Sequence, residues 1–461
     1  METLPSASDR PCVLWAVRPP ADERVALFGL TPVERTALAF ARAGVRRFLL
    51  AGDPATVAAL GRVLAAGPCK RLRVRSVDSL ALACAGDGPV LLARADCHYD
   101  RQLVRRFVAE TAGAVVPIVA VDFRPEARER GAALPQASVW SRGPRARVQQ
   151  VGRALMGADG VLVGLALATP AFLRAIDRRA PLPAPNDDQV DDPASPPPSG
   201  TATPAADAAE RAWLRGFAAL LTREPVESWA VHERWQPVQR PEDVARARRE
   251  VLAGAVRGTD GIVARHLNRP ISLRITERLL SRPVKPWQVS IASFATTLAA
   301  GLSFAIGHAT TGGLLAQAAS VLDGVDGELA RVRYQDSAFG GLYDALLDRV
   351  GEAAVIGGMT AYAWAMGAGA WAVALGFAAL AGNSLSMLVK EKYGTQFLQP
   401  WASEREGRWR WLLLGRDGRL FLTLVAGVTG QVELVLAYLA LGTHVHAGAR
   451  IARIRAEASR A

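Results

Sequence analysis

Four aspartates lie at fixed spacing in a strongly apolar part of the chain. Asp323 and Asp326 are three positions apart, and Asp344 and Asp348 are four apart, within DGVDGELARVRYQDSAFGGLYDALLD. On helices, residues at these spacings share one face. A carboxylate in an apolar helix is costly unless it faces a partner, a metal ion or water. The sequence therefore predicts two helices whose acidic faces enclose divalent cations such as Mg²⁺, Mn²⁺ or Ca²⁺, which prefer oxygen ligands.

These acids have a simpler interpretation as helix caps or surface charges. The apolar surroundings disfavour it, because ionisable residues inside membrane segments are functional by default. Gly327, Ala330 and Gly340 are small residues within the same stretch. They allow either close approach of a ligand to the helix backbone or close packing between helices in lipid.

The C-terminal third predicts an all-α membrane domain over 287–456 with about six transmembrane helices. Apolar segments lie at about 288–307, 311–333, 340–365, 369–389, 415–430 and 433–454. Several are shorter or more polar than an ideal span of ~20 apolar residues, as expected for helices that line a wet site. Basic residues gather at ends compatible with one side, which the positive-inside rule assigns to the cytoplasm. We therefore expect a multi-pass protein of the inner (cytoplasmic) membrane, in contact with membrane lipid.

Residues 10–180 predict an α/β domain in the cytoplasm. Apolar runs at 12–17, 46–52, 89–96, 114–123 and 160–167 are typical of buried strands, and 32–45 has helical spacing. This alternation predicts a mostly parallel sheet. Asp96 and Asp122 follow strands and are candidate metal ligands, although acids at strand ends are more often caps or turn formers. No cleavable signal precedes the domain.

Two further segments complete the expected organisation. Residues 181–209 are rich in Pro, Ala and Asp and predict a flexible linker. Residues 210–286 predict a helical juxtamembrane region, in which an amphipathic helix near 271–279 lies at the membrane surface or is an ordinary soluble helix.

Charge and cysteine content exclude several classes of protein. Lys plus Arg number 55 against 43 Asp plus Glu, which gives a net charge of +12. In a membrane protein this excess favours anionic headgroups and phosphorylated substrates, and no nucleic-acid motif accompanies it. Four cysteines without a C-x-x-C pair argue against a zinc site and a disulfide framework.

The pattern D-G-x2-A-R-x8-G-x3-D-x3-D resembles the signature of the CDP-alcohol phosphotransferase (phosphatidyltransferase) family. The resemblance implies a membrane enzyme that moves a substituted phosphoryl group from a CDP-alcohol to the hydroxyl of an acceptor alcohol and releases CMP. Two cations, Mg²⁺ or Mn²⁺, would bridge the pyrophosphate. The resemblance implies a role for each matched residue: the metal ligands are Asp323, Asp326, Asp344 and Asp348, the general base is Asp348, and the CDP moiety lies against Asp326, Gly327, Ala330, Arg331 and Gly340.

Basic residues outside the signature are candidates for binding a phosphate on the acceptor. They are Lys390, Arg416 and Arg419. Simple positive-inside anchoring explains each of them equally well.

A second resemblance concerns the order of the domains. The segment from TDGIVARHLNRPIS to ITERLL, followed by DGVDGELAR, is similar to the bifunctional inositol-phosphate cytidylyltransferase/di-myo-inositol-phosphate phosphate synthase group. That group places a sugar-phosphate nucleotidyltransferase of Rossmann-like fold before the membrane domain, and 10–180 resembles such a fold. The nucleotide-binding loop corresponds to 18–24, which has no glycine, so this resemblance implies a nucleotidyltransferase-like domain without nucleotide transfer.

Several functions remain open at this point. CDP-inositol is the donor that the second resemblance implies. The alternatives are a phosphatidyltransferase that uses CDP-diacylglycerol in phospholipid synthesis, a non-catalytic membrane scaffold and, more remotely, a small-molecule transporter. A homodimer is compatible with the sequence.

Overall fold

The computed structural model describes residues 10–16, 26–78, 80, 88–131, 134–139, 145–153, 155, 157–177, 204–256, 260–397, 401 and 403–458. The nucleotide-binding loop expected at 18–24 lies outside these residues, as does most of the expected linker. The chain divides into two compact units, Met1–Gly254 and Ala255–Ala461.

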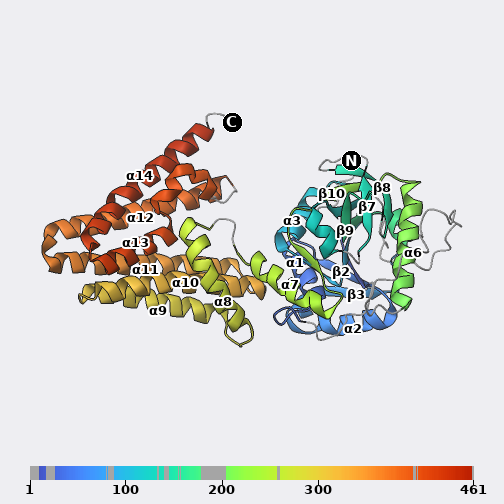
Figure 1. Cartoon of the computed structure of the whole chain (residues 1–461), viewed down its shortest axis with the longest axis horizontal. Helices are drawn as coiled ribbons and strands as arrows, with labels where there is room; N and C mark the ends of the chain where they lie inside the picture. Colours follow the sequence, from blue (N-terminus) through green and yellow to red (C-terminus); the bar gives the residue numbers. More distant parts are fainter. Residues whose placement is uncertain are drawn as a thin grey trace. The chain divides into compact units, whose positions relative to one another are not determined.

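The N-terminal unit is an α/β structure in which helices flank a sheet (Figure 1). Its strands are β1 (Cys12–Ala16), β2 (Arg47–Gly52), β3 (Arg73–Val77), β4 (Val90–Arg94), β5 (Cys97–Tyr99), β6 (Ile118–Asp122), β7 (Gln136–Val139), β8 (Arg145–Gly152), β9 (Gly160–Ala168), β10 (Glu227–Ala230) and β11 (Trp235–Pro237). Its helices are α1 (Pro32–Arg42), α2 (Pro54–Ala65), the short η1 (Gly67–Arg71), α3 (Arg101–Glu110), α4 (Pro125–Arg130), α5 (Pro170–Ile176), α6 (Pro204–Leu221) and α7 (Pro241–Gly254). The expected strands and the helix at 32–45 are therefore present.

The main sheet is mixed, whereas the sequence predicts a mostly parallel one. Its strand order is β3-β2-β1-β4-β9-β6-β10-β8-β7. The first four strands are parallel, as are β6 and β10. The long strand β9 runs antiparallel between β4 and β6, and β7 and β8 add a further antiparallel edge. The apolar run at 160–167 reveals a buried strand but carries no signal for its direction, which explains the difference.

The segment after the expected linker contributes to the core of the N-terminal unit. On α6, the ring of Trp213 lies 5.6 Å from that of Trp15 on β1, and the fully buried Phe217 contacts Phe172 edge to face. Strand β10 pairs with β6. Residues 210–254, expected in the juxtamembrane region, thus belong to the α/β unit, because α6 and β10 bury their apolar side chains there.

The C-terminal unit consists of long helices. They are η4 (Ala264–Asn268), α8 (Arg269–Leu280), α9 (Pro286–Ala305), α10 (Ala309–Val332), α11 (Ala338–Ala363), η5 (Trp364–Ala368), α12 (Ala370–Gln396), η6 (Ser403–Leu412), α13 (Arg416–Thr429) and α14 (Val432–Ala458). The close approach of α9 and α11 depends on glycine, since a Cβ at Gly358 would collide with the backbone of Gly301. Small residues at such crossings are typical of membrane helices.

Three helices in the described part of the chain are long and apolar enough to cross a membrane: α9, α12 and α14. Large apolar side chains on their outer faces are exposed, including Leu302 and Phe377. The structure therefore supports a membrane-associated helical unit with three candidate spans. The other expected spans, α10 and α11, carry the acidic residues of the signature, which lower their hydropathy, and α13 has only 14 residues.

Replacing Phe217 by Ala tests the assignment of α6 to the α/β core. The cavity left by this fully buried ring should lower the free energy of unfolding by about 3–5 kcal/mol. The measurement is denaturant unfolding of the full chain in detergent, followed by a probe of the N-terminal unit. Arg215→Ala, an exposed position on the same helix, is the control and should change little. Equal stability of both variants would show that α6 is not part of the core.

Candidate functional site

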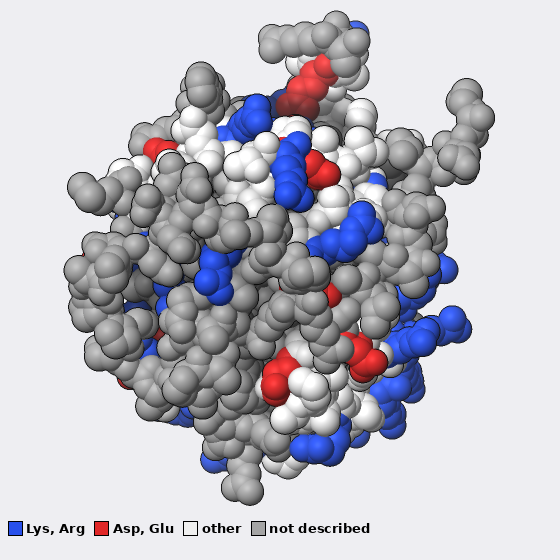
Figure 2. Space-filling view, turned by 90° about the vertical axis from the view of Figure 1, so that its right-hand side faces the viewer, with Lys and Arg blue, Asp and Glu red and all other residues white. Residues whose placement is uncertain are grey.

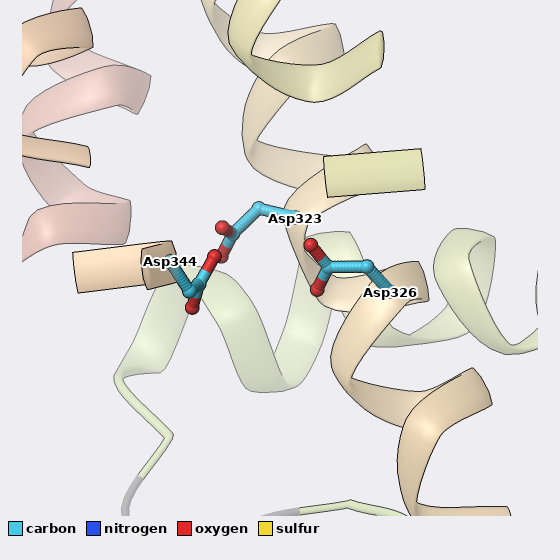
Figure 3. Close-up of side chains that lie close together, drawn as sticks. All are labelled: Asp323, Asp326 and Asp344. Atoms are coloured by element: carbon cyan, nitrogen blue, oxygen red, sulfur yellow. The ribbon is translucent and has the colours of Figure 1, made fainter. Parts of the chain in front are cut away.

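Three of the predicted acidic residues converge on one point. Asp323 and Asp326 extend from α10 and Asp344 from α11, and one carboxylate oxygen of each lies within 4.8 Å of the others. Figure 3 shows the three side chains pointing toward one another. The hydroxyl of Ser290 on α9 donates a hydrogen bond to Asp326 Oδ2 at 2.5 Å. Two helices therefore build the acidic group, and a third supports it.

This three-aspartate group fits a hard divalent cation. Oxygen ligands from carboxylates are those that Mg²⁺, Mn²⁺ and Ca²⁺ prefer, and three of them at this separation can share an ion. Like charges this close repel one another strongly in a partly buried site, so a cation between them is stabilising.

Asp348 lies one turn after Asp344 on α11 and has a different partner. Its Oδ1 accepts a hydrogen bond from Arg416, the first residue of α13. The same guanidinium donates to Asp323 Oδ2 at 2.6 Å. Asp323, Asp344, Asp348 and Arg416 line a small cavity beside the acidic group. Arg416 therefore links the two acidic helices to α13.

A pocket of about 260 Å³ opens against the three-aspartate group. Its wall combines the carboxylates with basic side chains from four other helices, α8, α12, α13 and α14. Among its lining residues are Asp260, Arg269, Asp323, Asp326, Gly327, Arg331, Asp344, Lys390, Glu406, Arg416, Asp417 and Arg450. An acidic corner beside basic side chains is an arrangement that can hold a metal ion and a phosphorylated ligand.

The residues expected around the CDP moiety fall into two groups. Gly327 and Arg331 line the pocket with Asp326, whereas Ala330 and Gly340 are absent from its described lining. A Cβ at Gly327 would lie 2.8 Å from Arg331 Nη1, so glycine leaves room for that guanidinium. Gly340 donates its N–H to Ser337 Oγ at 3.0 Å at the start of α11, which is a helix-capping contact.

The expected acceptor-phosphate residues also divide. Lys390 and Arg416 line the pocket. Arg419 is 6% exposed and points elsewhere, donating to Glu352 Oε1 and to the carbonyl of Leu414, both at 2.8 Å.

Arg450 is a pocket residue that sequence reasoning did not single out. It lies on α14, is 6% exposed, and donates to the backbone and hydroxyl oxygens of Ser386 at 2.8 Å. Glu406 accepts from its other guanidinium nitrogens. The available signal was a basic residue that follows a mostly apolar stretch of the helix, which in a membrane segment indicates a buried partner.

A second group of ion pairs fixes α8 against α10. Glu328 is fully buried and accepts from Arg269 at 2.6 Å, Ser272 at 2.6 Å and Thr276 at 2.7 Å. Arg269 also donates two hydrogen bonds to Asp260, at 2.7 and 2.9 Å. A buried carboxylate with three donors is satisfied, so Glu328 has a structural role and positions the α10 helix that carries Asp323 and Asp326.

The two candidate metal ligands of the N-terminal unit are each paired with an arginine. Asp96 receives two hydrogen bonds from Arg94, at 2.9 and 2.8 Å. Asp122 is fully buried and accepts from Arg124 and, at 2.7 Å, from Trp235. The hydrogen bond to Asp122 raises the pKa of Arg124. Both acids are therefore paired with an opposite charge within the fold.

Comparison with known proteins adds an independent observation. Residues 285–445, which contain the whole acidic site, match one known family. The family that these residues match is the CDP-alcohol phosphatidyltransferase family. The family is the one that the spacing of the aspartates resembles.

Curated relatives match part of the chain. A bifunctional IPC transferase and DIPP synthase of Rubrobacter xylanophilus is 37% identical over 211 residues, which are 45% of this chain and 46% of the relative. The protein of that name in Thermococcus kodakarensis is 36% identical over 41% of this chain and 43% of its own. An archaetidylinositol phosphate synthase of Methanothermobacter thermautotrophicus is 34% identical over 20% and 48%. The chain thus spans less than half the length of each of these relatives.

Among solved structures, the inositol-1-phosphate CTP transferase of T. maritima aligns with 53% of this chain and 97% of its own, with a TM-score of 0.37 and 12% identity.

Binding of Mn²⁺ tests the three-aspartate group directly. Asp344→Asn should weaken Mn²⁺ binding at least tenfold, because it removes one charged ligand of three. Isothermal titration of detergent-solubilised protein measures the affinity. Glu433→Gln, which removes an exposed carboxylate at the start of α14, should bind as the unaltered protein does. Equal affinity of the Asp344 variant and this control would place the ion elsewhere.

Proposed function

We propose that the chain is a metal-dependent CDP-alcohol phosphotransferase of the membrane. It transfers a substituted phosphoryl group from a CDP-alcohol to an acceptor alcohol and releases CMP. The observation that carries this proposal is the three-aspartate group beside a cationic pocket, within residues that match the CDP-alcohol phosphatidyltransferase family. The curated relatives support a transferase of this type. Because the chain covers less than half of their length, its substrates and partners are also part of what we propose.

The donor binds with its pyrophosphate at the acidic corner of the pocket. Two Mg²⁺ or Mn²⁺ ions held there would neutralise the pyrophosphate and the charge that develops on CMP. Asp323, Asp326 and Asp344 hold the cations. The guanidinium of Arg331 supplies donors to phosphate oxygens beside Gly327. Asp348 is an additional ligand of the cations. Ala330 and Gly340 lie at the site that binds the CDP moiety.

Asp348 is the residue that we assign as general base. Its Oδ1 holds Arg416, while its Oδ2 accepts no hydrogen bond from the described residues. That oxygen can take the proton of the acceptor hydroxyl as the hydroxyl oxygen bonds to the phosphorus next to the alcohol. The bond from this phosphorus to the oxygen of CMP then breaks, and CMP leaves with the electron pair.

The acceptor occupies the cationic wall. Lys390, Arg416 and Arg450 reach the pocket from α12, α13 and α14. Arg416 and Arg450 are ion-paired with Asp323, Asp348 and Glu406, so Lys390 is the cation that a phosphate on the acceptor would meet. The inositol phosphate products in the names of relatives support an inositol phosphate as acceptor. Arg419, which the sequence predicts at this site, does not line the pocket. Its guanidinium donates to Glu352, so we propose that it acts on the acceptor site through that carboxylate.

Two donors have specific support. CDP-inositol agrees with the bifunctional relatives. CDP-diacylglycerol agrees with the relatives named for lipid products. The exposed apolar side chains of Phe339 and Leu342, on the same helix as Asp344, suit a lipid tail.

The same proposal fixes the cellular setting. α9 to α14 would form six membrane spans of a multi-pass inner-membrane protein, with the active site and the N-terminal unit on the cytoplasmic side, where CDP-alcohols are made. The exposed apolar faces of the described helices support contact with lipid. A homodimer is compatible with this arrangement.

Release of CMP by the purified protein tests the proposal. CDP-inositol and CDP-diacylglycerol are each supplied with Mg²⁺ and a panel of polyols and polyol phosphates. Loss of the base in Asp348→Asn should lower turnover by about 10²–10⁴-fold. Asp336→Asn, in the turn between α10 and α11, is the control that should retain turnover.

Each outcome of this assay has a distinct meaning. Release from CDP-inositol supports a soluble product, and release only from CDP-diacylglycerol supports a phospholipid synthase. Normal turnover by the Asp348 variant excludes it as the base. No release from either donor, together with no Mn²⁺ binding, would favour a scaffold.

Lys390→Gln tests the acceptor site. Loss of a charge-assisted contact should raise the KM for a phosphorylated acceptor by about 10–100-fold, while the KM for the same polyol without phosphate stays unchanged. Steady-state kinetics measure both values. Lys392→Gln, an exposed lysine two residues further on, is the control. An equal rise for both acceptors would mean that Lys390 does not read the phosphate.

A further inference from the structure

One edge of the sheet in the N-terminal unit is strongly basic. Five exposed basic side chains lie on η1, on β3 and immediately before β2: Lys70, Arg71, Arg73, Arg75 and Arg46. Four of them fall within six consecutive residues. We call these five residues the β3 basic edge.

The β3 basic edge has no acidic partner among the described residues. Some exposed basic residues elsewhere in the same unit do have an acidic partner; Arg145, for example, lies 3.5 Å from Glu227. Charge on the β3 basic edge is therefore not neutralised within the described part of the unit.

The register of the sheet brings a further basic residue to this edge. β2 and β3 are parallel, and Arg47 is the direct neighbour of Arg73. Like charges placed side by side on neighbouring strands are destabilising. Arg47 therefore adds positive charge next to Arg73 at this edge.

Protection of a free strand edge is the simplest reason for charges on β3. β3 is the terminal strand of the main sheet, and basic residues at such edges prevent pairing with other strands. This reason accounts for Arg73 and Arg75 but not for Lys70 and Arg71 on η1 or for Arg46 before β2. It also excludes a second copy of the chain as the occupant, because two basic edges repel each other.

The partner with the best physical support is an anionic lipid surface. The two units belong to one chain, and the C-terminal unit has three helices able to cross a membrane. The N-terminal unit therefore stays within molecular dimensions of a bilayer. Each basic residue close to an anionic surface strengthens association roughly fivefold. Figure 2 shows blue basic side chains gathered along one side of the visible face, whereas red acidic ones are scattered.

We propose that the β3 basic edge docks the N-terminal unit on the anionic headgroups of the membrane that holds the C-terminal helices. This contact is electrostatic and places β3 and η1 at the lipid surface. It is independent of the reaction proposed above, because none of its five residues lies in the unit that carries the acidic site.

Fluorescence quenching of the full chain in nanodiscs tests the docking. A fluorophore is attached at Ser76→Cys, an exposed position on β3, in a Cys84→Ser background. The described cysteines Cys12, Cys69 and Cys97 are buried, and burial raises the pKa of each thiol, so they should not compete for the label. The quencher is carried on lipid headgroups. Quenching should be several-fold stronger in discs that contain phosphatidylglycerol than in pure phosphatidylcholine discs, and high salt should abolish the difference.

Two matched triple variants separate this contact from the overall charge. Arg71→Gln/Arg73→Gln/Arg75→Gln should weaken docking by roughly 100-fold and remove the extra quenching. Arg105→Gln/Arg147→Gln/Arg174→Gln removes the same charge from exposed positions on α3, β8 and α5 and should retain it. Equal quenching in both kinds of disc, or equal loss in both variants, would overturn the proposal. So would a change in fluorescence caused only by added nucleic acid, which would identify a different partner.

Discussion

Mutual repulsion among clustered carboxylates is the constraint on which the C-terminal unit depends. Three aspartates place oxygens within 4.8 Å of one another between helices whose outer faces are apolar. Such a cluster is unfavourable unless positive charge compensates it. The fold supplies part of this compensation through Arg416, which reaches Asp323 and Asp348 from α13. A divalent cation at the three-aspartate group would supply the rest.

The surrounding ion pairs show how helices distant in sequence are fixed around this cluster. Glu328 ties α8 to α10, and Glu352 on α11 accepts from Arg419 on α13 and Asn383 on α12. Glu406 orients Arg450 on α14 toward the pocket. Each of these three buried glutamates has an opposite charge or a set of donors, as a low-dielectric interior requires. The basic wall and the acidic corner are thereby held in one pocket.

Much of the fold and site follows from local sequence pattern, and the remainder depends on contacts that local pattern does not carry. The i, i+3 and i, i+4 spacing of the aspartates predicts their shared faces, and apolar runs predict β1, β2, β4, β6 and β9. By contrast, β10 joins β6 across more than a hundred residues, and α6 belongs to the α/β core because of Trp213 and Phe217. Contacts with residues far along the chain likewise place Arg450 at the pocket, through Ser386, and keep Arg419 out of it, through Glu352.

Anomalous diffraction from crystals grown with Mn²⁺ and CMP is the most direct test of the central claim. The account predicts a strong Mn²⁺ peak bounded by Asp323, Asp326 and Asp344, with the phosphate of CMP beside it in the pocket. A peak at another site, or CMP bound away from these carboxylates, would contradict the account.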